Sequence, residues 1–149
     1  RCTVVLDTLA ESYDADGFER AVTAAASAVA AASAAGIAAR LVAPQLDLRG
    51  PDVAPLSLRW LATVDMSDDV VDHSGNGRSA SDGLGVVVVI TSHVASRAAV
   101  AAVAAAVPED VVIVVCTMVS AANSRGFTID ATSLSELHRS WSHLVVGRA

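Results

Sequence analysis

The chain has few aromatic side chains and no lysine. Aromatic residues make up 3% of its 149 residues although 53% are hydrophobic, so the core must be built mainly from alanine, valine and leucine. No apolar run has both the length and the hydrophobicity of a membrane span. A chain of this length fits one domain with a single core, and we expect residues 1–149 to form it without touching a membrane.

Basic residues are scattered singly along the chain, and the formal net charge is −6. Without a basic stripe, nucleic acid is excluded as a partner. Cysteine is also scarce: Cys2 and Cys116 each lie in an apolar stretch, and neither has metal-binding or redox-motif spacing. We expect two buried free thiols and a reducing, cytoplasmic compartment.

Three short and nearly continuous apolar runs, at 3–6, 86–90 and 111–115, are typical of strands that are covered on both faces of a parallel sheet. Further strands are predicted at 37–43 and 127–130, and a short antiparallel edge at 46–49. Segment 66–85, rich in aspartate, serine and glycine, is predicted to be a flexible surface loop.

Helical patterns lie between these strands. Asp16 and Glu19 predict a capping box for a first helix that ends at Gly36, and Ser133 and Glu136 predict one for the last helix. Pro55 is predicted to open another helix, and a fourth is expected at 94–107. The side chains expected to face the core are Phe18, Val22, Val29, Leu56, Trp60, Leu61, Val64, Val100, Val103, Val107, Leu134, Leu137, Trp141 and Leu144.

The alternation of strands and helices predicts the α/β class. We expect a three-layer sandwich with a mostly parallel central sheet of Rossmann-like topology and helices on both faces.

Polar side chains follow the strands at 3–6 and 86–90. If these strands are neighbours, their tips meet at one edge of the sheet, where ligands of open parallel sheets bind. The candidate interaction site, which we call the rim, consists of Asp7, Thr8, Glu11, Thr91, Ser92 and His93. One interpretation is a divalent-cation site formed by Asp7, Glu11 and His93. The interpretation we favour is that Asp7 caps local backbone amides or faces the N-terminus of the following helix, where a negative charge is favourable.

Other activities lack their motifs. The turn at 7–11 contains no glycine and carries two carboxylates, which would repel a phosphate, so a nucleotide is excluded. No GxSxG elbow is present either. His138 and His143 fit a solvated helix face, and Trp60 and Trp141 fit core packing better than partner anchoring. We therefore expect no enzymatic activity.

The chain resembles a von Willebrand factor A-like domain, and more narrowly the C-terminal domain of the bacterial family called domain of unknown function fifty-eight. Its genes often neighbour those of MoxR-type AAA+ ATPases. The resemblance is one of pattern along the whole chain, carried by segments 3–8, 18–22, 40–42 and 58–62 and by Trp141.

In such domains a metal-ion-dependent adhesion site uses Asp-x-Ser-x-Ser after the first strand, and an aspartate after the fourth. Asp7 keeps the first position, Leu9 and Glu11 replace both serines, and Ser92 stands where the second aspartate is expected. The site is thus degenerate, and no metal or other cofactor is expected. Mg²⁺ is the cation that a complete site would hold, and Asp7 is the one candidate ligand left.

The resemblance also implies a context. Relatives carry membrane helices ahead of this domain, and the start at Arg1 without a methionine suggests the C-terminal part of a longer, membrane-anchored bacterial protein with this domain in the cytoplasm. We expect a non-enzymatic adaptor or scaffold that works with a MoxR-type AAA+ ATPase. The alternatives are a metal-dependent hydrolase that uses Asp7, Glu11 and His93, and a purely structural module.

Overall fold

The computed structural model describes residues 1–44, 46–69, 85–92, 101, 105, 107, 111–118 and 127–146, the last five by their backbone alone. Within these residues, no helix has the length and hydropathy needed to cross a membrane.

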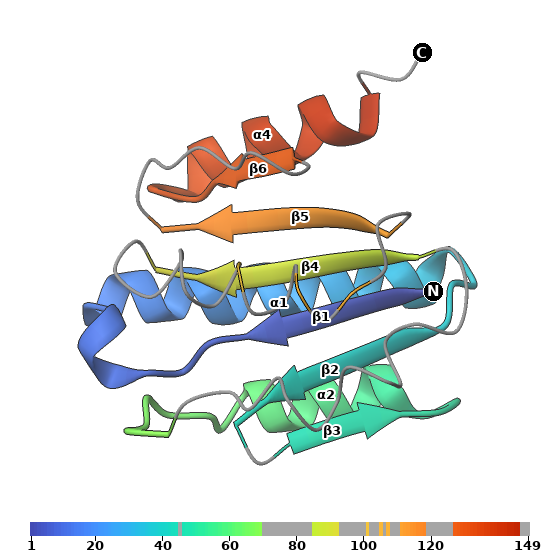
Figure 1. The fold of residues 1–149 in the computed structure, drawn as a ribbon, viewed down its shortest axis with the longest axis horizontal. Helices are drawn as coiled ribbons and strands as arrows, with labels where there is room; N and C mark the ends of the chain where they lie inside the picture. Colours follow the sequence, from blue (N-terminus) through green and yellow to red (C-terminus); the bar gives the residue numbers. More distant parts are fainter. Residues whose placement is uncertain are drawn as a thin grey trace.

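A six-stranded sheet forms the centre of the fold, in the order β3-β2-β1-β4-β5-β6 (Figure 1). All neighbouring strands are parallel except β2 and β3. The α/β class and the mostly parallel sheet are thereby confirmed. The strands are β1 (Cys2–Leu6), β2 (Ala39–Ala43), β3 (Leu46–Arg49), β4 (Val86–Thr91), β5 (Val112–Thr117) and β6 (Phe127–Asp130).

The predicted strands at 46–49 and 127–130 match β3 and β6, and the antiparallel edge is confirmed. The strand predicted at 37–43 begins two residues later, because Ile37 still belongs to the end of the preceding helix: its N–H donates to the Ala32 carbonyl, 2.9 Å away. Gly36, with φ at +68°, makes this helix ending possible.

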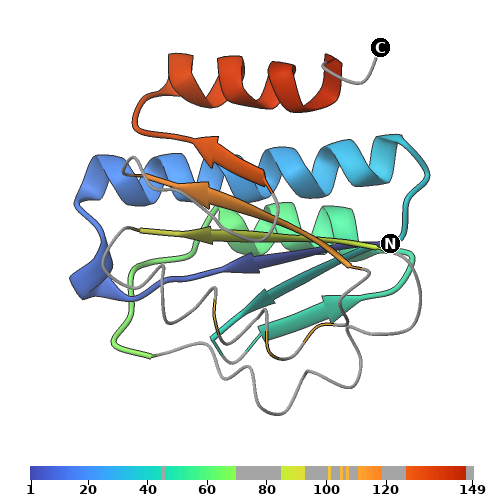
Figure 2. The same ribbon diagram turned by 45° about the horizontal axis from the view of Figure 1, so that its top comes forward.

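Three helices are described: α1 (Ala15–Ala34), α2 (Val53–Leu61) and α4 (Leu134–Val146), together with a short 3₁₀ turn, η1 (Ala10–Ser12). Their buried side chains, among them Val29, Leu61 and Leu137, join one core cluster with alternate residues of the strands. These three helices therefore cover the same face of the sheet (Figure 2).

The opposite face of the sheet carries its own apolar cluster, in which Val107 and Val111 pack against valines of the strands. Val107 is buried, as predicted. Residues 101 and 105 are helical, but the rest of the helix predicted at 94–107, with Val100 and Val103, lies outside the described residues, as does most of the loop predicted at 66–85.

Helix α1 begins two residues earlier than predicted. Asp14, and not Asp16, is the N-cap: its Oδ1 accepts a hydrogen bond from the Gly17 N–H, with 2.6 Å between the heavy atoms. A Cβ on Gly17 would lie 2.7 Å from that same oxygen, so a larger residue there would require the Asp14 side chain to shift. The predicted capping box of Asp16 and Glu19 is wrong.

Helix α2 begins at Val53 rather than at Pro55. Its buried stripe runs through Val53, Ser57 and Leu61, spaced four residues apart. This stripe is turned away from Leu56, which is 44% exposed, so the prediction of a buried Leu56 is wrong. Trp60 is half-buried against the core, as expected.

Helix α4 begins after Ser133, whose Oγ accepts from the Glu136 N–H at 3.2 Å, and this N-cap is confirmed. Leu137 and Trp141 pack on the core. Leu134 is 54% exposed, contrary to prediction, because it precedes the first turn that reaches the sheet. Cys2 and Cys116 are free thiols, and Cys116 is 1% exposed. Burial raises the pKa of Cys116 to about 12.

Candidate functional site

The carboxyl ends of β1 and β4 lie side by side at the centre of the sheet (Figure 1). From β1 the chain continues to β2 on one side, and from β4 it continues to β5 on the other. Such a switch point in an open parallel sheet is where ligands bind, because the loops that follow the two strands diverge there. The predicted neighbourhood of the two strands is confirmed, and the described residues of the rim follow these strand ends.

Asp7 links the two strand tips. Its N–H donates to the Ile90 carbonyl at 3.0 Å, and its side chain accepts two hydrogen bonds. Oδ1 accepts from the Leu9 N–H and Oδ2 from the Thr91 hydroxyl, each at 3.0 Å. Asp7 is 8% exposed, so these donors compensate much of the cost of its burial. The favoured interpretation, that Asp7 caps local backbone, agrees with this geometry.

Ser67, in the segment after α2, lies beside the loop that follows β1. It pairs with Leu9 in an isolated parallel bridge. The Ser67 N–H donates to the Thr8 carbonyl and the Ala10 N–H donates to the Ser67 carbonyl, both at 2.8 Å. The hydroxyls of Thr8 and Ser67 lie 3.0 Å apart and share a hydrogen bond. The sequence analysis missed Ser67, because no local pattern marks a bridge across 59 positions.

Among the described residues, two buried hydroxyl groups near Asp7 form no hydrogen bond of ordinary geometry. One is Ser92, at the tip of β4, which is 2% exposed. The other is the phenol of Tyr13, whose ring packs edge-on against Phe18 with centroids 5.6 Å apart. Burial raises the pKa of Tyr13 far above its usual value, and the charges of Asp7 and Cys116 raise it further. The Thr91 hydroxyl offsets this only in part. Tyr13 therefore stays protonated at neutral pH.

The polar row continues across the sheet from Thr91. Thr91 lies opposite Thr117 on β5, and Thr117 lies opposite Asp130 on β6. Both threonines are fully buried. Asp130 Oδ1 accepts from the Thr132 N–H at 2.9 Å, and this bond lowers the pKa of Asp130. The sequence analysis missed Thr117 and Asp130, although the position of Asp130 as the last residue of a predicted strand is a signal that could have found it.

The structure therefore brings together Asp7, Thr8, Thr91 and Ser92 of the predicted rim. Glu11 lies exposed on η1, on the same loop as Asp7. His93 lies outside the described residues. In the part of the chain that is described, no three side chains of histidine, cysteine, aspartate or glutamate gather closely enough to hold a metal ion.

The surface beside the rim is acidic with an apolar centre. Asp65 and Asp68 are exposed on either side of Met66, which is itself 38% exposed, and the Leu9–Ser67 bridge holds this segment against the loop that carries Glu11. Arg20, the nearest cation on α1, is directed elsewhere: its Nε donates to the Ala131 carbonyl at 3.0 Å. The segment therefore offers exposed carboxylates next to one exposed apolar side chain.

Comparison of the chain with protein-family models, with curated proteins and with solved structures finds no match.

Proposed function

We propose that this chain is a non-enzymatic α/β interaction domain, an adaptor or scaffold, that binds a protein partner through Glu11 of the rim and the exposed residues of the neighbouring segment, Asp65, Met66 and Asp68. The observation that carries the proposal is that hydrogen bonds hold the rim at two places. Asp7 joins the ends of β1 and β4, and Ser67 joins the loop after β1 to the segment after α2. Both sets of hydrogen bonds are made within the domain, and they hold the loops that carry the exposed surface in one conformation. These loops therefore lose less conformational entropy when a partner binds.

The chemistry of the surface indicates the partner. Glu11, Asp65 and Asp68 are exposed beside Met66, so the complementary surface would carry arginine or lysine around an apolar side chain. From the resemblance to von Willebrand factor A-like domains, we propose a MoxR-type AAA+ ATPase as this partner. The same resemblance supports a cytoplasmic domain of a membrane-anchored bacterial protein, with a degenerate metal-ion-dependent adhesion site.

A binding assay between the purified domain and the ATPase encoded beside it, without nucleotide and with ATP or ADP, tests the proposal. We expect saturable binding in at least one state. The double variant Glu11→Gln and Asp68→Asn is expected to weaken it by about tenfold or more. Asp52→Asn, which removes an exposed carboxylate at the start of α2, is the matched control. Absence of binding in every state, or an equal loss in the control, contradicts the proposal.

A second candidate function is a metal-dependent hydrolase that uses Asp7, Glu11 and His93. The observation that favours it is the hydroxyl of Ser92, directly after the end of β4, which has no hydrogen-bond partner among the described residues and follows the strand that pairs with β1. Calorimetry with Mn²⁺ tests this candidate function. Micromolar binding of Mn²⁺ that is lost in Asp7→Ala but kept in Asp52→Asn supports the metal-dependent hydrolase. No heat of binding in the wild type contradicts it.

A further inference from the structure

Strand β6 and helix α4 form one unit at an edge of the sheet (Figure 1). Among the described strands, β6 pairs with β5, and α4 follows β6 after a short turn. Separation of this unit breaks the pairing of β6 with β5 and leaves the pairs among β1 to β5 intact. The position of the unit therefore allows it to open without unfolding the rest of the sheet.

The described side chains of this unit are less buried than those of α1. Ile129, Ala131 and Leu137 are buried, and Trp141 packs on the core while staying partly exposed. Phe127, at the start of β6, is 42% exposed. Helix α1, in contrast, buries eight residues against the sheet. Because segments with fewer buried apolar side chains open at a lower free energy, this unit should open before α1 does.

Arg20 joins this unit to α1. Its Nε donates to the Ala131 carbonyl at 3.0 Å, in the turn between β6 and α4. The Ala131 N–H in turn donates to the Thr117 carbonyl at the end of β5, at 2.9 Å. The Arg20 side chain is half-buried and its donor is charged, so this hydrogen bond contributes more than one between neutral groups. The bond is lost when the unit opens.

Cys116 on β5 is covered by this unit. It lies opposite Ile129 in the pairing of β5 with β6, and both side chains belong to the same core cluster as Leu137. Cys116 is 1% exposed. Burial, with a smaller contribution from the charge of Asp130, raises the pKa of the Cys116 thiol to about 12. The thiol is therefore protonated and hidden from reagents while the unit is in place.

We propose that β6 and α4 open together from the sheet while β1 to β5 stay folded, and that the bond from Arg20 to Ala131 controls how often they open. The opening exposes the Cys116 thiol and the edge of β5. An unpaired strand edge can pair with a strand of another chain, so the open form offers a binding surface that the closed form hides.

Labelling of the thiols with methyl methanethiolsulfonate in increasing urea tests the proposal, with Cys116 and Cys2 distinguished by peptide mass spectrometry. The reagent is kept dilute, so that the labelling rate is proportional to the open population. We expect Cys116 to be labelled below the unfolding transition, with a weaker urea dependence than global unfolding, because the opening exposes less surface. Labelling of Cys116 with the full urea dependence and free energy of global unfolding contradicts the proposal.

Two variants separate the opening from global unfolding. Arg20→Met removes the donor to Ala131, so Cys116 should be labelled about tenfold faster or more without urea. Val53→Ala, on α2, weakens packing against Ala32 and Ala39 that persists in the open form. It should lower the free energy of global unfolding and leave the labelling of Cys116 unchanged. Equal acceleration in both variants, or none in Arg20→Met, contradicts the proposal. If Arg20→Met does not fold, the wild type and Val53→Ala still decide.

Discussion

The hydroxyl of Thr91, at the end of β4, donates to the carboxylate of Asp7, just past the end of β1, with 3.0 Å between the oxygens. Thr91 is fully buried and Asp7 nearly so. The bond joins the two central strands at the switch point of the sheet, beyond the last backbone pair that they share, Leu6 and Ile90. The shape of the rim depends on it.

Replacement of Thr91 by valine should destabilise the protein, because Asp7 Oδ2 would lose its donor while staying buried. A hydrogen bond to a charged group contributes about 1.5 to 3 kcal/mol, and we expect a loss of that size in the free energy of unfolding measured with urea. Thr91→Ser keeps the hydroxyl and should recover most of the loss. A Thr91→Val variant as stable as the wild type would contradict the assigned bond to Asp7.

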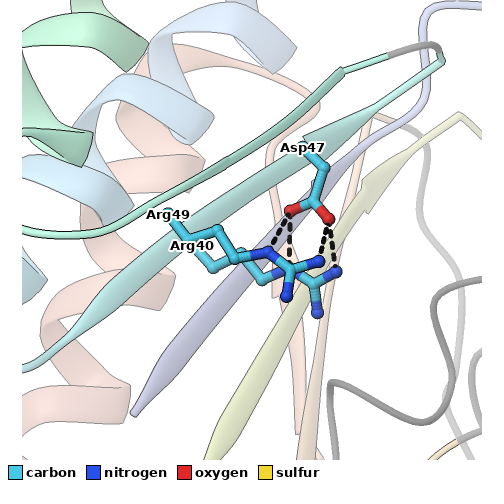
Figure 3. Close-up of polar contacts among 3 residues, drawn as sticks. All are labelled: Arg40, Asp47 and Arg49. Atoms are coloured by element: carbon cyan, nitrogen blue, oxygen red, sulfur yellow. Dashed lines mark hydrogen bonds and ion pairs between the residues drawn. The ribbon is translucent and has the colours of Figure 1, made fainter.

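The bond between Asp47 on β3 and Arg40 on β2, with 2.8 Å between Oδ1 and Nε, predicts a pH dependence of stability (Figure 3). The hydrogen bond from Arg40 lowers the pKa of Asp47 in the folded state. The stabilisation that the ionised Asp47 gives the folded protein is therefore fully present above its unfolded pKa of about 3.9, and it is lost as the pH falls toward the folded pKa. Asp47→Asn leaves Arg40 buried without its countercharge and should cost about 3 kcal/mol at neutral pH.

Urea unfolding of both proteins between neutral and acid pH measures this difference. Other carboxylates titrate in both proteins, so the difference in the free energy of unfolding between the wild type and Asp47→Asn reports on Asp47. This difference should become smaller below about pH 4. A difference that stays constant across the acid range would contradict the assigned ion pair.

Two serines should respond to alanine in opposite directions. Ser57 is fully buried on α2, and its hydroxyl has no hydrogen-bond partner among the residues that the structure describes, so Ser57→Ala should be neutral or stabilising by up to about 1 kcal/mol. Ser133 caps α4, so Ser133→Ala should cost about 1 kcal/mol. Thermal or urea unfolding measures both, and a marked destabilisation by Ser57→Ala would reveal a bond to its hydroxyl.

Tyr13 is the single tyrosine of the chain, so the ultraviolet absorbance of phenolate reports on it alone. Its pKa is raised in the folded state. The stability that depends on the neutral phenol is therefore fully present below the unfolded pKa of about 10 and is lost as the pH rises above it. In an alkaline titration, phenolate should form only as circular dichroism shows unfolding. Ionisation near pH 10 in a folded protein would contradict the burial of the hydroxyl.

Strands β1, β4 and β5 could be predicted because each contains a short, nearly continuous apolar run. Segment 127–130 alternates apolar and polar residues, and the prediction agrees with β6 at both ends. Ser133 could be predicted as an N-cap because a serine three residues before a glutamate is a local signal. The start of α1 could not be placed between Asp14 and Asp16, because both can act as caps, and the choice depends on the close contact with Gly17.

The site could be predicted only where it follows the strand tips. Asp7 and Thr91 were expected there because the carboxyl ends of parallel strands share one edge. Ser67 and Tyr13 come from segments whose packing against that edge depends on tertiary structure. The Arg40–Asp47 pair was likewise missed, since it follows from the register of β2 against β3 and not from a motif.

The Leu9–Ser67 bridge has a mechanical consequence for any complex at the rim. Two backbone hydrogen bonds join the turn after β1 to the segment after α2, so a molecule that binds one of these segments also holds the other in place. Tension on either stretch would reach the centre of the sheet through Thr8, the immediate neighbour of Asp7.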